Sequence, residues 1–183
     1  MIKLLFSFFG IAILSSNSIH AGIYGPLEFG DNRGTVTRKL QQCDLVTQTV
    51  PSTFLARTGL NGIFKCKHQL AGLIYSLYFG WNDAGGLNEI TLRSDEIDHS
   101  QYHTGLQQAW HKANTLFTQA YQAPAQNAKY PSKSDFKGRD ILISHIWHKG
   151  TTQSILMGPG ITKDKCFLTI RFVDRHVKPV RIP

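Results

Sequence analysis

The hydrophobic and polar positions along the chain follow first a strand-like and then a helix-like period. Residues 70–81 are rich in Leu, Ile, Tyr and Phe, which is typical of a strand covered on at least one face. Residues 87–93 alternate cleanly between two faces, and the Asn-Asp-Ala-Gly-Gly stretch at 82–86 is a turn by composition. Two strands around a five-residue loop that contains glycine predict an antiparallel hairpin. The shorter stretch 62–68 predicts another strand before this hairpin.

The best helical pattern runs from about His99 to Gln122. Apolar side chains recur there every three or four residues, from Tyr102 to Ala120. Acidic residues precede the start of this stretch, where the helix dipole favours negative charge. Pro124 ends it, because the residue before a proline avoids helical geometry.

Strands return after the long helix. A polar connection at 124–139 leads to a predicted meander of three strands, at 141–148, 153–157 and 165–174. Turns are expected at Lys149-Gly150 and at Gly158-Pro159-Gly160, and residues 175–183 are expected to form an edge strand or a tail. Near the start of the chain, Thr35 caps a short predicted helix. The pattern therefore predicts an α+β fold, with an antiparallel sheet in two strand groups packed against one long helix, and a short N-terminal helix.

The first 21 residues are typical of a secretory signal peptide. Lys3 supplies a positive charge, a largely apolar stretch of eleven residues from Leu4 to Leu14 follows it, and the small Ala21 offers a cleavage point. Eleven apolar residues are too few to cross a hydrocarbon core, which needs about 20 in a helix. We therefore expect a signal peptide at 1–21 and a single domain at 22–183. The expected localisation is periplasmic or secreted, with no transmembrane segment after cleavage.

Positive charge is concentrated in the second half of the chain. The chain has 20 basic and 12 acidic residues, which give a formal net charge of +8. Residues 22–99 carry seven basic and eight acidic side chains, whereas residues 100–183 carry twelve basic and four acidic ones. In an exported protein, this balance favours an acidic protein or an anionic envelope component as partner over nucleic acid. Charge alone carries no specificity, so a basic surface without a partner is the alternative.

Three cysteines, Cys43, Cys66 and Cys166, allow one disulfide bond and one free thiol. An exported chain meets an oxidising compartment, where a disulfide is expected to form. We expect Cys43 to pair with Cys66, because these two are nearest in sequence. A bond between Cys66 and Cys166 is the alternative.

Histidine offers the main candidate for metal binding or catalysis. His99 and His103 are spaced to share one face of a helix, and Asp98 beside them would supply an oxygen ligand. This pattern lacks the glutamate of a zinc-protease signature, and the chain has no G-x-S-x-G elbow and no phosphate-binding glycine loop. His145 and His148 would point to opposite faces of a strand. The sequence therefore assigns no catalytic residue, no metal ligand and no cofactor.

Two segments carry a resemblance to a known class of protein. Gly34–Leu40 is a glycine-led short helix before strands, and Leu77–Trp81 continues through Gly86–Leu92 to a long helix. Together they resemble outer-membrane assembly lipoproteins of the BamE type and beta-lactamase-inhibitor-like domains. This chain departs from them because it has no lipidation cysteine and adds a long helix and another meander. The resemblance implies a non-catalytic binding module that uses a sheet face or loops, and it carries over no functional residue.

These features predict an exported, non-catalytic protein-binding module, such as an inhibitor, a toxin-neutralising immunity protein or an envelope assembly factor. It would act by steric occlusion, with its basic half steering an acidic partner. Protein interfaces favour aromatic anchors and basic side chains, so the candidate contacts are Phe79, Trp81, Trp147, Lys129, Lys133, Lys137 and Arg139. Core packing is the alternative for the aromatic residues, above all for Phe79.

The rival function is an exported hydrolase that acts on cell-wall polymer or another anionic substrate. A cleft that contains Asp98, His99 and His103 would favour the hydrolase, and a convex, cleft-free surface would favour the binding module.

Overall fold

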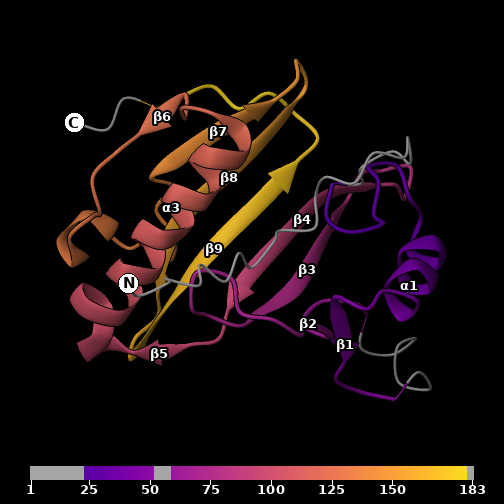
Figure 1. The fold of residues 1–183 in the computed structure, drawn as a ribbon, viewed down its shortest axis with the longest axis horizontal. Helices are drawn as coiled ribbons and strands as arrows, with labels where there is room; N and C mark the ends of the chain where they lie inside the picture. The colour runs from indigo at the N-terminus through magenta and orange to yellow at the C-terminus, as the bar shows by residue number, and fades with distance from the viewer. Residues whose placement is uncertain (1–22, 52–58, 181–183) are drawn as a thin grey trace, which may run out of the picture.

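The computed structural model describes residues 23–51 and 59–180 (Figure 1). The predicted signal peptide at 1–21 lies outside the described residues. The first half of the chain contains α1 (Arg33–Gln41), β1 (Val46–Gln48), β2 (Phe64–Cys66), β3 (Tyr75–Trp81) and β4 (Leu87–Ser94). The second half contains β5 (Ile97–Asp98), α3 (Gln107–Tyr121), β6 (Gln126–Asn127), β7 (His145–Lys149), β8 (Gln153–Ile161) and β9 (Lys165–Val173).

One antiparallel sheet of nine strands joins the two halves. The strand order is β1-β2-β3-β4-β9-β8-β7-β6, and β5 pairs with β9 outside this path. Each half is therefore a helix followed by a meander of neighbouring strands, and the last strands of the two meanders, β4 and β9, pair at the centre of the sheet. The α+β prediction, with strand groups on either side of a long helix, is confirmed.

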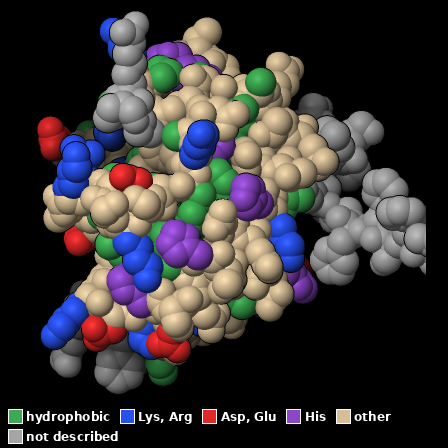
Figure 2. Space-filling view, turned by 90° about the vertical axis from the view of Figure 1, so that its left-hand side faces the viewer, with side chains coloured by type: hydrophobic (Ala, Val, Ile, Leu, Met, Phe, Trp, Pro, Cys, Tyr) green, Lys and Arg blue, Asp and Glu red, His purple; other side chains and the backbone are tan. Residues whose placement is uncertain are grey.

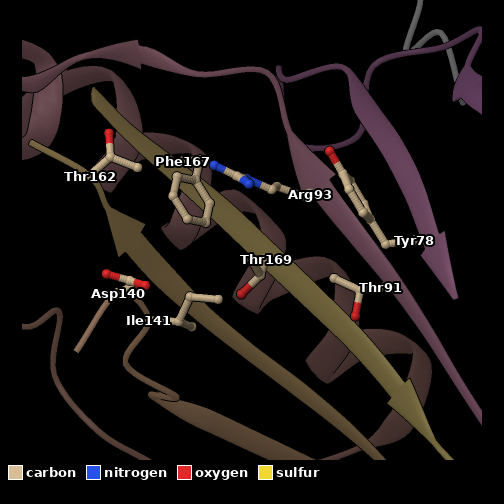
Figure 3. Close-up of a pocket in the computed structure, with 8 residues that line it drawn as sticks. All are labelled: Tyr78, Thr91, Arg93, Asp140, Ile141, Thr162, Phe167 and Thr169. Carbon is tan, nitrogen blue, oxygen red and sulfur yellow. The ribbon is translucent and has the colours of Figure 1, made fainter. Parts of the chain in front are cut away.

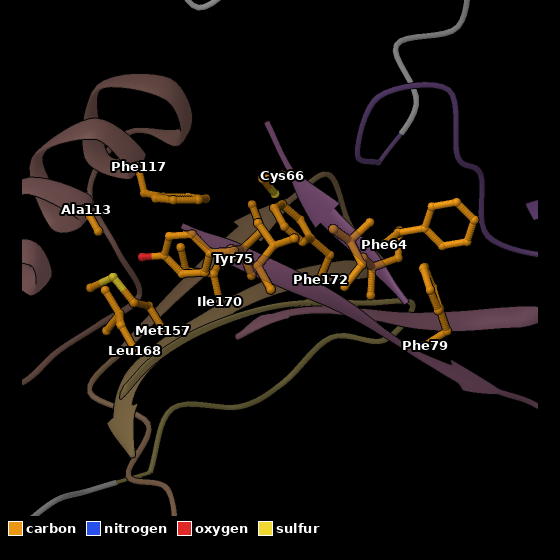
Figure 4. Close-up of a cluster of buried hydrophobic side chains, with 14 of the residues drawn as sticks. Phe64, Cys66, Tyr75, Phe79, Ala113, Phe117, Met157, Leu168, Ile170 and Phe172 are labelled. Carbon is orange, nitrogen blue, oxygen red and sulfur yellow. The ribbon is translucent and has the colours of Figure 1, made fainter. Parts of the chain in front are cut away.

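Both helices cover the same face of the sheet, because both contribute to one hydrophobic core. Val36 and Leu40 of α1 belong to the same buried cluster as Phe117 of α3. Figure 4 shows Phe117 and other side chains of this cluster packed over the strands. Full burial of a large apolar side chain stabilises a fold by about 1.5–3 kcal/mol relative to exposure. The opposite sheet face carries neither helix, and we call it the helix-free face.

The long helix begins irregularly. Residues 99–101 form a 3-10 turn and residues 102–106 a π-helical turn before regular α-helix starts at Gln107. Two side chains from outside the helix bind backbone carbonyls in this segment: Tyr130 donates to the Tyr102 oxygen and Lys133 to the His99 oxygen. The predicted helix over 99–122 is thus found at the expected residues, but its first two turns are 3-10 and π-helical rather than α-helical.

The expected turn at Gly158-Pro159-Gly160 is wrong, because these residues lie inside β8. A Cβ atom at Gly158 would lie 1.8 Å from the backbone oxygen of Leu142, and one at Gly160 would lie 2.3 Å from the ring of Phe167. The glycines therefore permit a close approach within the sheet. The turn itself comes a few residues later, where the Thr162 amide donates to the Lys165 oxygen at 2.8 Å.

The end of the described chain crosses the helix-free face as a C-terminal strap, residues 174–180. The Val177 side chain packs against a small apolar cluster formed by Ile146, Leu156 and Val173. The Val177 amide donates to Ser154 Oγ, and further along the Val180 amide donates to Gln126 Oε1, each at 2.8 Å. The strap covers the β7–β8 half of this face. In the part of the chain that the structure describes, no helix has the length and hydropathy to cross a membrane.

Candidate functional site

A groove of about 320 Å³ lies on the half of the helix-free face near the central pair of strands (Figure 3). Strand alternation explains its position. Tyr78 of β3 pairs in register with Thr91 of β4, and Arg93 of β4 pairs with Thr169 of β9, so these four side chains share one face. We call this the sheet-face groove, and its lining residues are Tyr78, Thr91, Arg93, Asp140, Ile141, Thr162, Phe167 and Thr169.

Arg93 is the cationic group of the groove. Its guanidinium carbon lies 3.9 Å from the ring centroid of Phe167, which is within cation–π range. Its Nη2 atom donates to the Glu96 carboxylate at 2.6 Å. About a third of the Arg93 side chain and 44% of the Glu96 side chain are exposed, so this ion pair lies at the surface.

Hydroxyl groups in the groove are largely committed to the protein itself. Thr91 Oγ1 donates to Glu89 at 2.8 Å, and Thr169 Oγ1 donates to the Gly158 oxygen at 3.0 Å. A hydroxyl has one proton, so neither threonine has a second one to offer to a ligand. The cationic hydrogen-bond donor among the lining residues is Arg93.

Beside the groove, Glu89 and Arg171 form a bidentate ion pair, with N–O distances of 2.9 and 2.7 Å. Burial alone would raise the pKa of Glu89, but the hydrogen bonds and charge of Arg171 outweigh burial and lower the pKa. Arg171 is thereby occupied by a partner within the protein. Among the lining residues, the positive charge belongs to Arg93 and the negative charge to Asp140.

Two of the predicted contact residues are buried, which favours the alternative of core packing, although Phe79 also lines a small cavity together with Trp81. Trp147 is fully buried and Phe79 is 6% exposed. Both lie on the helix-covered face, where Trp147 contacts Phe117 and Phe79 belongs to the main core cluster. Strand alternation fixes which face each aromatic ring occupies, and these two positions fall on the core side.

Trp81 lies at a second, smaller cavity of about 140 Å³. It is half-buried, and the Arg33 guanidinium carbon lies 5.2 Å from its ring centroid. This cavity contains none of the groove residues and lies at the far end of the β3–β4 hairpin from Arg93.

The four predicted basic contacts separate into two groups. Lys133 turns inward, with its Nζ 2.9 Å from the His99 oxygen and 5.6 Å from the Tyr102 ring centroid. Lys129, Lys137 and Arg139 are exposed. Lys137 and Arg139 come just before Asp140, so they lie in the segment that leads to the groove. Figure 2 shows the α3 side, where basic side chains are scattered among histidine, acidic and uncharged groups.

None of the three cysteines is paired, so the expected Cys43–Cys66 disulfide is not present. The Tyr24 hydroxyl contacts the Cys66 sulfur at 3.0 Å, and Cys43 lies beside the Gly25 backbone. Cys166 is buried on β9. Burial raises the pKa of both the Cys66 and the Cys166 thiols, which disfavours the reactive thiolate.

The histidine pattern near the long helix does not form a site. Within residues 23–51 and 59–180, no three His, Cys, Asp or Glu side chains are grouped so that they could hold a metal ion. Asp98 instead forms an ion pair with Lys165. Asp98, His99 and His103 line neither the sheet-face groove nor the smaller cavity at Trp81.

Sequence analysis missed the residues that form the groove. The alternation of 87–93 places Thr91 and Arg93 on one polar face, so the sequence contained a signal that these two lining residues share a surface. Phe167 shares a face with Thr169 by the same alternation, but an aromatic ring is equally typical of a core position, so this signal was ambiguous. Its placement beside Arg93 depends on the pairing of β4 with β9.

No protein family model, curated protein or solved structure matches this chain.

Proposed function

We propose that this protein is an exported, non-catalytic protein-binding module, and that an acidic partner docks on the sheet-face groove. The observation that carries the proposal is an open groove on a helix-free sheet face that is lined by a cation, Arg93. Exposed Lys137, Arg139 and Lys163 occur in the two chain segments that lead into the groove at Asp140 and Thr162. These charges complement an acidic surface and would speed its approach.

The lining supports binding rather than hydrolysis. Asp140 is its one carboxylate, and no histidine or cysteine is among the lining residues. Glycosidic hydrolysis by the usual route requires a pair of carboxylates on either side of the bond. A single aspartate with aromatic, threonine and arginine neighbours orients a ligand but provides no acid–base pair.

The biological role that fits these features is occlusion of an acidic surface on a protein of the bacterial envelope or of a toxin. An inhibitor, a toxin-neutralising immunity protein or an envelope assembly factor would use such a surface, and the resemblance to BamE-type and beta-lactamase-inhibitor-like modules implies a binding module that uses a sheet face or loops. Export through the segment 1–21 would place the protein in the periplasm or outside the cell.

Site-specific photo-cross-linking tests this proposal. A photoreactive phenylalanine analogue replaces Tyr78 in the groove, and a matched variant carries it at Lys112 on the exposed side of α3. In envelope fractions of the producing cells, we expect one acidic protein to be cross-linked stoichiometrically from Tyr78 and not from Lys112. High salt should abolish the adduct, because screening weakens exposed charge pairs.

Equal cross-linking from both positions would show that the groove is not the docking surface. Release of soluble fragments from purified cell-wall polymer by the unmodified protein would contradict the non-catalytic assignment and favour the hydrolase.

A further inference from the structure

The geometry around Arg93 leaves much of its hydrogen-bonding capacity unused. The guanidinium lies against the Phe167 ring, at 3.9 Å from the centroid. A guanidinium has five N–H donors in one plane, and stacking on a ring leaves the edges of that plane open. Among the described residues, the one hydrogen bond from Arg93 side-chain nitrogens goes to Glu96. Two parallel hydrogen bonds to a carboxylate are the arrangement that arginine favours.

Glu96 competes only weakly with a ligand carboxylate for the Arg93 guanidinium. It stands three residues from Arg93 on the same chain, and it engages one terminal nitrogen only. Both side chains are partly in water, where an ion pair contributes little to stability. A carboxylate that approaches from the groove can therefore replace Glu96 at small cost.

We infer that the sheet-face groove recognises a carboxylate of an extended acidic segment of the partner, and that Arg93 exchanges Glu96 for this carboxylate. This inference rests on the proposed function and names the chemistry of its ligand. The volume of about 320 Å³ is enough for one side chain and the adjoining backbone.

The other lining residues determine the orientation in which the acidic segment binds. Figure 3 shows Arg93 and Asp140 on different sides of the Phe167 ring. Asp140 repels a carboxylate and accepts hydrogen bonds, so it faces backbone or side-chain N–H groups of the ligand. The acidic group is thereby restricted to the Arg93 end. Thr91 and Thr169, whose protons are committed, offer acceptor lone pairs to N–H groups of the ligand.

Binding of a terminally blocked pentaglutamate peptide to the purified protein, measured by titration calorimetry, tests this inference. A pentaglutamine peptide of the same length is the neutral control. We expect the glutamate peptide to bind at least about tenfold more tightly than the glutamine peptide, since charge-assisted bonds are roughly twice as strong as neutral ones. Arg93→Gln should remove this difference, and Arg93→Lys should restore it in part, because lysine keeps the charge and loses the planar fork.

A pair of charge-matched variants separates the exchange at Arg93 from a general charge effect. Glu96→Gln frees Arg93, whereas Asp95→Asn removes the same charge from the adjacent residue and frees Lys65 instead. We expect Glu96→Gln to tighten binding of the glutamate peptide by about threefold or more, and Asp95→Asn to leave it within about twofold. This gain in affinity does not depend on how well an Arg93 variant folds.

Equal effects of Glu96→Gln and Asp95→Asn would overturn the exchange at Arg93. Equal binding of the two peptides, insensitive to Arg93→Gln, would overturn carboxylate recognition while leaving docking on the groove intact. If neither peptide binds, the inference fails, and cross-linking from Tyr78 decides the proposed function separately.

Discussion

The side chain of His145 lies wholly inside the molecule, between α3 and the sheet. Ser144 Oγ accepts from Trp110 Nε1 and donates its own proton to the Met157 oxygen. His145 Nδ1 must then be the donor in its 3.0 Å contact with Ser144 Oγ, which leaves Nε2 as the unprotonated nitrogen. Nε2 has no hydrogen-bond partner among the described residues. A proton placed there would create a buried charge without an acceptor.

This environment predicts loss of stability in mild acid. Burial, with a contribution from the charge of His111, lowers the pKa of His145 to about 4. The unfolded chain takes up a proton near its ordinary pKa of about 6.5, and the folded protein does not. This contribution to stability is therefore nearly complete at pH 7.5 and is lost as the pH falls through 6.5 toward 4, by about 3 kcal/mol in total.

Urea unfolding at pH 7.5 and pH 5 measures this loss. In His145→Gln the pH dependence should shrink, although the variant is less stable at pH 7.5. His68→Gln, at an exposed position, should keep the full pH dependence of the unmodified protein. An unchanged pH dependence in His145→Gln would show that other groups are responsible.

At the scale of elements, the local pattern predicts the fold well where it is strictly periodic. The β3–β4 hairpin and the body of α3 follow directly from alternation and from the three-to-four-residue repeat. The pattern fails at Gly158, because a glycine that permits a close approach looks the same in sequence as a turn glycine. It also fails at Trp147, since alternation groups the residues of β7 by face but does not show which of its two apolar faces meets the helices. The groove could not be predicted, because β4 and β9 pair across a long separation in sequence.

The C-terminal strap is an element held largely by side chains of the sheet it crosses. His148 Nε2 lies 3.1 Å from the Val177 oxygen, and the rings of His148 and His176 have centroids 3.9 Å apart. Beneath the strap, Ile146 and Leu156 are buried. Deletion of residues 175–183 should expose this apolar cluster, lower the melting temperature and increase fluorescence of a hydrophobic dye.

Ser154→Ala serves as the milder variant, because it removes only the acceptor of the Val177 amide at 2.8 Å. It should lower stability by about 1 kcal/mol without a comparable rise in dye binding. If the deletion leaves both the melting temperature and dye binding unchanged, the strap does not protect the cluster.

At the scale of the whole molecule, charge complementarity joins the two halves. The slightly acidic first half contributes Glu89 and Asp98, and the basic second half contributes their partners Arg171 and Lys165. The pairing of β4 with β9 is thus stabilised by backbone hydrogen bonds, core packing and at least one half-buried ion pair. Part of the positive charge of the second half is balanced inside the protein rather than presented to a partner.

Glu89→Gln should destabilise the protein by about 1–3 kcal/mol, because it leaves the half-buried Arg171 without its counter-charge. Lys65→Gln, which breaks the more exposed pair with Asp95, should cost less than about 1 kcal/mol. Chemical unfolding of the two variants at pH 7 gives both values. Equal losses of stability would show that the Glu89–Arg171 pair contributes no more than the exposed Lys65–Asp95 pair.

The central pairing of β4 with β9 also connects ligand binding to folding. Glu89 and Arg171 are 82 residues apart in sequence, whereas each meander pairs strands that are neighbours along the chain. Closing the long connection has the higher entropic cost, so the two meanders are expected to join late during folding. Arg93 belongs to one meander and Phe167 to the other, and the groove exists only after they have joined. A ligand in the groove therefore binds only the state in which the two meanders are paired. By mass action it would stabilise this late-forming pairing.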